Sequence, residues 1–315
     1  MLRNLPKNIA EFSKVEFKKF FDSFDYVLLD CDGVLWLHNN VIDGSNTVVN
    51  RLIELGKKIY FITNNSTKTR DELAEKAKTM NFNVGFDNMI STSYLAAHYL
   101  KSLNFNKKVY IVGSTGISRE LDAVGIKHTG VGQDPMNGSL ATLVKEQFKP
   151  DPEIGAVIVG FDEHISFPKM MKAATYLDKK ETIFIATNTD ERFPMPGFVI
   201  PGTGSIVRAI ETCGERKAIV MGKPENWLCD IFFKEEMKKD RSRFLMVGDR
   251  LNTDILFGKK NKLQTLLVET GVHKIERVKE IIEELENSKE QDEELVNQIP
   301  DFYITKLGDL LNNLD

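Results

Sequence analysis

The order of apolar and polar segments predicts an α/β protein with a parallel-sheet core and an inserted second domain. Short apolar runs alternate with amphipathic segments along the chain of 315 residues. The segments that suggest catalysis lie before about residue 70 and after about residue 217, and the block between them carries none. We therefore expect a core formed by 1–102 and 217–315, interrupted by a domain at 103–216 that covers the site as a lid.

Eight apolar runs have the length of buried strands and end at polar or turn-forming residues. They are Tyr26–Leu29, Lys58–Ile62, Val109–Val112, Ala156–Val159, Thr182–Ala186, Ala218–Met221, Phe244–Val247 and Thr265–Val268. Apolar residues spaced three and four apart predict helices between several of these strands. The expected helices are 45–55, 67–80, 91–103 and 167–178. Stretches rich in glycine and proline predict loops at 130–138 and 194–204.

The segment 274–297 is dominated by glutamate and lysine, with apolar residues from Ile275 to Leu285 at helical spacing. This pattern predicts a solvated helix followed by an acidic loop at 286–297. A tail that binds a partner is the alternative interpretation.

The composition is that of a soluble globular protein, with 42% hydrophobic and 28% charged residues. A net charge of −4 does not favour nucleic-acid binding, which usually shows a basic patch. No apolar run has the length of a membrane span. Three cysteines in no spaced cluster suggest reduced thiols. We expect a cytoplasmic protein with neither a nucleic acid nor a membrane as partner.

Asp30 and Asp32 follow the first predicted strand directly. A carboxylate at a strand end can attack phosphorus and form an aspartyl-phosphate. A second carboxyl two residues later can act first as general acid and then as general base. By itself this D-x-D pattern also fits an ordinary turn. The preceding apolar run and Gly33, a candidate phosphate contact, favour the catalytic interpretation.

Asp249 and Asp254 follow the predicted strand Phe244–Val247. Together with Asp30 they would form an oxygen-rich site suited to Mg²⁺. We expect Asp249 to bind the ion. Asp254, together with Asn252, would orient the Asp249 carboxylate. Capping of the following helix is the alternative role of Asp254.

Polar residues that can bind phosphate follow two further strands. Thr63, Asn64 and Asn65 offer hydroxyl, amide and backbone N–H donors before a helix, although an ordinary turn with capping residues explains them as well. Lys223, held between Gly222 and a proline, would balance the charge of the nucleophile and of the phosphate, unless it is a surface lysine. Because ligands bind beyond the carboxyl ends of parallel strands, we expect these groups at one edge of the sheet.

Taken together, these segments resemble the four motifs of the haloacid dehalogenase superfamily of aspartate-nucleophile phosphatases. The matching segments are D-C-D-G-V-L-W at 30–36, T-N-N at 63–65, G-K-P at 222–224 and G-D-R-L-N-T-D at 248–254. Two further segments, F-D-E-H-I-S-F at 161–167 and P-G-T-G-S at 201–205, are similar to the phosphoglycolate and pyridoxal-phosphate phosphatase branch.

The resemblance implies a Rossmann-like, doubly wound core with an inserted α/β cap. It implies Asp30 as nucleophile and Asp32 as acid and base, with Mg²⁺ held by the Asp30 carboxylate, the Asp32 carbonyl and Asp249. Thr63 and Asn64 would bind phosphate and Lys223 would anchor it. The residues after Asp32, as far as about 40, would form a small flap. Relatives of this branch are commonly homodimers through the cap.

The loop 186–197 matches the part of the cap that governs substrate choice in this branch. Pyridoxal-phosphate phosphatases carry histidine there, whereas this chain has Arg192. An arginine suits a small carboxylate by bidentate pairing. The loop therefore favours 2-phosphoglycolate or glycerol-3-phosphate as substrate, unless Arg192 is a surface or interface residue.

Three other functions compete with a Mg²⁺-dependent small-molecule phosphatase. A pyridoxal-phosphate phosphatase would share the site, and a protein phosphatase would need room for a bulky substrate beneath the cap. A phospho-accepting receiver domain also has strand-end aspartates and a lysine. Receivers are much shorter and lack an acid/base at the position of Asp32.

Overall fold

The computed structural model describes residues 5–193, 197–288 and 292–314. The chain divides into two compact units. The first unit comprises Met1–Thr63, Asp71–Ile90 and Phe232–Asp315, and the second comprises Asn64–Arg70 and Ser91–Ile231. Among the described residues, no helix has the length and apolar character needed to cross a membrane.

A seven-stranded sheet forms the centre of the first unit. Its order is β1 (Lys7–Asn8), β16 (Phe302–Ile304), β15 (Gln264–Val268), β14 (Phe244–Gly248), β2 (Tyr26–Leu29), β5 (Lys58–Thr63) and β6 (Met89–Ser91). The first six strands in this spatial order, β1, β16, β15, β14, β2 and β5, each pair in parallel with their neighbours. Their carboxyl ends therefore lie at one edge of the sheet.

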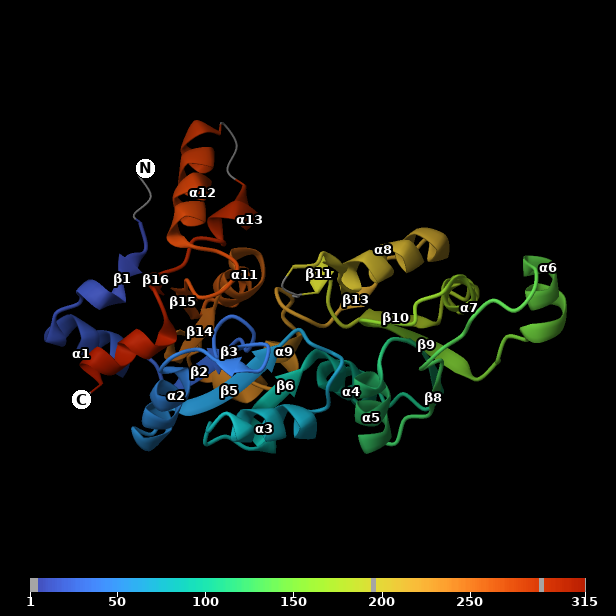
Figure 1. Ribbon diagram of the computed structural model, residues 1–315, viewed down its shortest axis with the longest axis horizontal. Helices are drawn as coiled ribbons and strands as arrows, with labels where there is room; N and C mark the ends of the chain where they lie inside the picture. The colour runs from blue at the N-terminus through green and yellow to red at the C-terminus, as the bar shows by residue number, and fades with distance from the viewer. Residues whose placement is uncertain (1–4, 194–196, 289–291, 315) are drawn as a thin grey trace. The chain divides into compact units, whose positions relative to one another are not determined.

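Helices cover both faces of this sheet (Figure 1). The face that carries Val27, Leu29 and Val247 packs on α1 (Lys14–Asp22), α2 (Ser45–Glu54) and α3 (Arg70–Thr79). The opposite face packs on η5 (Leu251–Ile255) and α12 (Ile275–Asn287) through Leu267, Val278 and Ile281. Strand residues thus alternate between two apolar layers, as expected for a doubly wound sheet.

The remaining elements of the first unit are short. They are η1 (Ile9–Glu11), the antiparallel hairpin β3 (Trp36–Leu37) and β4 (Asn40–Val41), η2 (Phe86–Asn88), α10 (Lys234–Lys239), η4 (Arg241–Arg243), α11 (Leu256–Lys260), α13 (Glu293–Val296) and η6 (Leu307–Asn313).

The second unit is built on a five-stranded parallel sheet. Its order is β13 (Ile219–Val220), β10 (Ile183–Ala186), β9 (Ile154–Val159), β7 (Lys108–Val112) and β8 (His128–Thr129). The helices α7 (Phe167–Leu177) and α8 (Thr203–Gly214) pack on one face of it through Leu177, Val207 and Ile210. The other elements are α4 (Thr92–Ser102), α5 (Thr115–Ala123), α6 (Leu140–Thr142), η3 (Leu143–Gln147), α9 (Trp227–Ile231) and the antiparallel hairpin of β11 (Arg192–Phe193) with β12 (Ile200–Pro201).

The α/β class is confirmed, and each of the eight predicted runs corresponds to a strand whose limits differ from the prediction by at most two residues. One placement was wrong: the strand before Lys223 does not belong to the core sheet. It is β13, which pairs with β10 in the five-stranded sheet. An apolar run shows that a strand forms, but its pairing partner is set by contacts far away in the sequence.

The prediction missed three strands of the core sheet, β1, β6 and β16, and the structure differs from it in further segments. The predicted loop at 194–204 contains β12, although its residues 194–196 lie outside the described part of the chain. The predicted helix at 67–80 begins only at Arg70. In 274–297, α12 ends at Asn287 and a short helix, α13, lies within the predicted acidic loop, of which 289–291 are not described. The predicted domain limits 1–102, 103–216 and 217–315 stay a prediction.

Candidate active site

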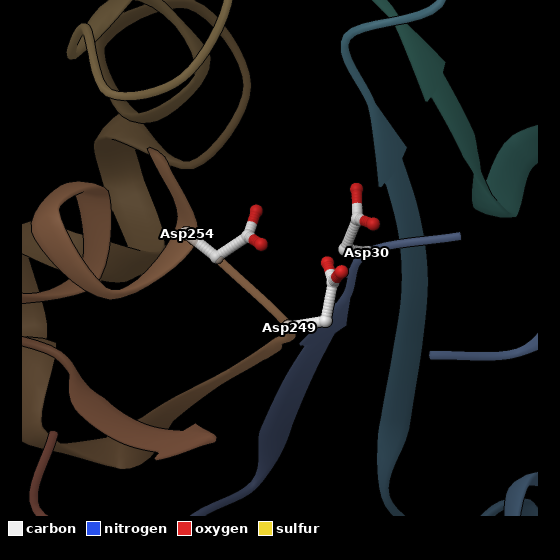
Figure 2. A group of neighbouring side chains, drawn as sticks. All are labelled: Asp30, Asp249 and Asp254. Atoms are coloured by element: carbon white, nitrogen blue, oxygen red, sulfur yellow. The ribbon is translucent and has the colours of Figure 1, made fainter. Parts of the chain in front are cut away.

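Three aspartates meet at the carboxyl edge of the core sheet (Figure 2). Asp30 follows β2 and Asp249 follows β14, and these two strands are neighbours in parallel register. Asp254 lies in the turn of helix that follows Asp249. One carboxylate oxygen from each of the three residues lies within 4.8 Å of the other two. The sequence prediction that these groups share one sheet edge is met for these three residues.

The Asp249 carboxylate is enclosed by two glycines. A Cβ atom at Gly33 would lie 2.6 Å from Asp249 Oδ2, and a Cβ atom at Gly271 would lie 1.9 Å from the same oxygen. Gly33 also has φ of +94°, which disfavours any other residue. Both positions therefore require glycine so that the carboxylate can lie between two backbone segments.

Backbone N–H groups hold Asp249 and Asp254 in place. The N–H of Val272 donates to Asp249 Oδ2 at 2.7 Å. The N–H of Arg250 donates to Asp254 Oδ2 at 3.1 Å. Asp249 is 2% exposed and Asp254 is 1% exposed, so both carboxylates are removed from bulk water.

This arrangement of carboxylates fits a small divalent cation. Two unit charges 4.8 Å apart repel by roughly 3.5 kcal/mol at an effective dielectric constant near 20. A cation held between the three carboxylates would offset this repulsion. Hard carboxylate oxygens in this number are the ligands that Mg²⁺ prefers.

Asp32 lies at the base of the β3–β4 hairpin. It forms an isolated bridge with Trp36, and the N–H of Gly33 donates to the Trp36 carbonyl at 2.8 Å. Trp36 is 1% exposed and meets the rings of Phe61 and Phe82 edge-on. The base of the predicted flap is thus anchored in the core.

A second polar group lies wholly within the second unit and is centred on Asn64. The Asn64 side chain accepts the Lys223 N–H at 2.9 Å and donates to the Lys223 carbonyl at 3.1 Å. It also lies 3.3 Å from Asp190 Oδ1, and the Asn188 amide donates to the Asn64 carbonyl at 2.6 Å. Lys223 is 6% exposed, so it is not a surface lysine. Its backbone is fixed on both sides by Asn64.

The other predicted site residues have different surroundings. Thr63 is buried at the end of β5 in the first unit. Asn65 closes a local turn, since its Oδ1 accepts from the N–H and the hydroxyl of Thr67 at 2.8 and 2.7 Å. Arg192 is exposed on β11, next to Phe193. Asn252 is exposed within η5.

The described residues thus contain two groups of predicted site residues. Asp30, Asp249 and Asp254 meet in the first unit, and Asn64 and Lys223 meet in the second. Residues that contact these groups and were not singled out by the sequence analysis include Asn188 and Asp190, both within the predicted substrate loop 186–197, and the segment 270–273. The last of these begins one residue after the end of β15, after Glu269, so a strand-end pattern like the one that pointed to Asp30 could have indicated it.

Comparison with known proteins connects this geometry to a family. The model of haloacid dehalogenase-like hydrolases matches residues 27–127, and a second model, of HAD-hydrolase-like proteins, matches 220–310. The chain is 38% identical over 302 residues to a glycerol-3-phosphate phosphatase of Mus musculus, covering 91% of this chain and 90% of that one. The chain belongs to the haloacid dehalogenase-like hydrolases.

Two further relatives narrow the branch of this family. A chloroplastic phosphoglycolate phosphatase of Arabidopsis thaliana is 34% identical, over 98% of this chain and 82% of its own length. The solved structure of a p-nitrophenyl phosphatase from Archaeoglobus fulgidus superposes with a TM-score of 0.74 at 28% identity, covering 92% of this chain and 99% of that one. The phosphatase branch predicted from the motifs is confirmed, and the chain is a phosphomonoester hydrolase.

Proposed function

We propose that this haloacid dehalogenase-like phosphatase hydrolyses a small phosphomonoester through a covalent intermediate on Asp30, with 2-phosphoglycolate or glycerol-3-phosphate as substrate. The observation that carries the chemistry is the meeting of Asp30, Asp249 and Asp254 at the edge of the core sheet. Asp30 is the member of this group that the burial pattern leaves partly exposed, as a nucleophile requires.

The reaction would proceed in two steps at Asp30. In the first, a carboxylate oxygen of Asp30 forms a bond to phosphorus while the bond from phosphorus to the ester oxygen breaks, and Asp32 gives its proton to that oxygen. In the second, Asp32 takes a proton from water as the water oxygen attacks phosphorus and the bond to Asp30 breaks. Inorganic phosphate and an alcohol are the products, and Asp32 regains its proton.

Asp30, Asp249 and the Asp32 carbonyl would hold Mg²⁺, with Asp254, supported by Asn252, orienting Asp249. When bound, the ion supplies positive charge that offsets the repulsion between the Asp30 carboxylate and the phosphate. That repulsion is about 4 kcal/mol for two unit charges at ~4 Å and an effective dielectric near 20. The close approach of the three carboxylates supports this assignment.

Thr63, Asn64, Asn65 and Gly33 would contact the phosphate, and Lys223 would anchor it with its positive charge. The pair of hydrogen bonds between Asn64 and the Lys223 backbone supports a joint role for these two residues. The Oδ1 atom of Asn65 is engaged by Thr67, so the contribution of Asn65 would come through its other polar groups.

The substrate assignment rests on Arg192 and on the names of the relatives. The exposed guanidinium on β11 would pair with a small carboxylate such as that of 2-phosphoglycolate. Relatives that cover nearly the whole chain are named for glycerol-3-phosphate and for phosphoglycolate. Pyridoxal phosphate is the second candidate, and a phosphoprotein the third. We also propose a cytoplasmic homodimer formed through the inserted domain.

The deciding experiment combines a substrate panel with one variant. Purified protein is assayed with 2-phosphoglycolate, glycerol-3-phosphate, pyridoxal phosphate, a phosphotyrosine peptide and p-nitrophenyl phosphate. The expected kcat/KM is highest for one of the first two, and Asp30→Asn abolishes turnover of all five while the circular dichroism spectrum stays unchanged. Activity of Asp30→Asn within tenfold of the unmodified enzyme contradicts the nucleophile assignment. A higher kcat/KM for pyridoxal phosphate or the peptide contradicts the substrate assignment alone.

A further inference from the structure

The segment from Thr270 to His273 connects the loop after β2 with the loop after β14. The Thr270 hydroxyl donates to the Gly33 carbonyl at 2.5 Å, and the Val272 N–H donates to Asp249 Oδ2 at 2.7 Å. The N–H of His273 donates to the Asp249 carbonyl at 3.0 Å. This segment therefore contacts both the backbone and the side chain of Asp249.

The side chain of His273 adds a contact of another kind. Its Nδ1 atom accepts the N–H of Leu251 at 3.0 Å, across 22 residues of sequence. Leu251 is the first residue of η5 and is fully buried. The first N–H groups of a helix have no partner within the helix, so a buried one requires an acceptor from elsewhere. His273, which is partly buried, supplies it.

The position of Leu251 makes this contact important for the carboxylates. Leu251 lies between Asp249 and Asp254 in the sequence. The N–H of Arg250, the residue between Asp249 and Leu251, donates to Asp254 Oδ2 at 3.1 Å. The turn from Asp249 to Asp254 is thus fixed by Val272 at one end and by the Arg250–Asp254 hydrogen bond at the other. The His273 imidazole fixes its middle.

We propose that His273 is a positioning residue for the divalent cation: its Nδ1 atom, by accepting the Leu251 N–H, sets the separation of the Asp249 and Asp254 carboxylates. This inference rests on the proposed function, because it takes these carboxylates as the metal site. Groups that orient metal ligands without touching the metal typically change metal affinity by 10–100-fold when they are removed.

Two substitutions of similar polarity separate this role from simple packing. In His273→Asn, the amide oxygen stands one bond from Cγ, as Nδ1 does, so it can accept the Leu251 N–H. In His273→Gln, the oxygen stands one bond farther out, where Nε2 lies, although glutamine is closer to histidine in volume. A residue that only fills space would tolerate glutamine at least as well as asparagine.

The test measures binding of Mn²⁺ to the full chain by electron paramagnetic resonance, with no substrate present. We expect the dissociation constant of His273→Asn to stay within about threefold of the unmodified protein and that of His273→Gln to rise at least tenfold, within the range for such groups. The Mg²⁺ concentration for half-maximal hydrolysis of p-nitrophenyl phosphate should move in parallel. Thermal unfolding in EDTA verifies that both variants are folded.

Equal affinities of the two variants, or tighter binding by His273→Gln, overturn the inference. The unmodified protein serves as the reference for the proposed function. If it binds Mn²⁺ and hydrolyses p-nitrophenyl phosphate while the variants do not differ, only the role of His273 fails. If it binds no divalent cation, the proposed metal site fails and the role of His273 fails with it.

Discussion

A Cβ atom at Gly271 would lie 1.9 Å from Oδ2 of Asp249, which is closer than any non-bonded carbon and oxygen can approach. The next residue along the chain is Val272, and its N–H donates to the same Asp249 oxygen at 2.7 Å. The backbone at 271–272 therefore approaches Asp249 closely enough to bind its carboxylate only because position 271 has no side chain.

Gly271→Ala should displace the Asp249 carboxylate and weaken both cation binding and catalysis. Gly85→Ala is a matched control in the same unit, because a Cβ there would have its nearest neighbour, Asn88 Oδ1, at 4.0 Å. We expect Gly271→Ala to lose at least tenfold in Mn²⁺ affinity, as for other groups that orient metal ligands. Gly85→Ala should match the unmodified protein, and similar losses in both variants would show a general effect on the fold.

Most of the cluster of Asp30, Asp249 and Asp254 could be predicted from the sequence, because the pattern that indicates it is local: a carboxylate after an apolar run. Asp30 is the first residue after β2, and Asp249 is the first residue after β14. Because these strands are parallel, both residues lie at the carboxyl edge of the same sheet. The sheet to which β13 belongs could not be predicted in this way, because its pairing with β10 depends on contacts about 35 residues away. The contact of His273 with Leu251 is equally non-local, and no periodicity in either segment indicates it.

The proposed metal site leads to a prediction about ion selectivity. EDTA should remove activity and Mg²⁺ should restore it, whereas Ca²⁺ should inhibit. Ca²⁺ takes more ligands at longer distances, so it does not impose the octahedral geometry that holds the phosphate in line with Asp30. Initial rates with p-nitrophenyl phosphate in each ion measure this. Full activity with Ca²⁺ alone contradicts the assignment of Asp30, Asp249 and Asp254 to a Mg²⁺ site.

The ion pair between Lys169 and Asp162 leads to a prediction about stability. The two side chains are 0% and 3% exposed, and Lys169 Nζ lies 2.6 Å from Asp162 Oδ2. Lys169→Met would leave a buried carboxylate without its cation, which typically costs about 3–5 kcal/mol. The exposed pair of Lys238 with Glu235 is the control, and Lys238→Met should cost less than about 1 kcal/mol. Urea unfolding measures the free energy of unfolding of both variants. Comparable losses would mean that burial does not decide how much an ion pair contributes to stability.

His98 leads to a prediction about the pH dependence of stability. Burial, with the nearby charges of Lys101 and Arg70, lowers the pKa of His98 below its ordinary value of 6.5. The unfolded chain therefore binds the proton more readily than the folded one. The stability that His98 contributes is present above pH 6.5 and is lost as pH falls through its folded pKa.

The free energy of unfolding should therefore fall more between pH 8 and pH 5 in the unmodified protein than in His98→Gln. Glutamine keeps polar character at this position on α4, where the His98 ring lies 4.1 Å from that of Tyr94. Urea titrations of both proteins at the two pH values give the difference directly. Identical changes in the two proteins would show that His98 does not couple folding to protonation.

Substrate recognition leads to the last prediction, which concerns Arg192. If its guanidinium binds the carboxylate of 2-phosphoglycolate, Arg192→Ala loses a charge-assisted interaction of about 1.5–3 kcal/mol, or roughly 10–150-fold in KM. Arg208→Ala is a matched control, because Arg208 is also exposed and makes a surface ion pair with Glu191 at 3.3 Å. Hydrolysis of p-nitrophenyl phosphate, which has no carboxylate, should change little in either variant. The comparison separates recognition from chemistry, because Asp30 and Asp32 are intact in both. Equal losses on both substrates would mean that Arg192 supports the β11–β12 hairpin. No loss on either substrate would mean that Arg192 is a surface residue without a role in recognition. The argument from this residue for phosphoglycolate as substrate would then fail.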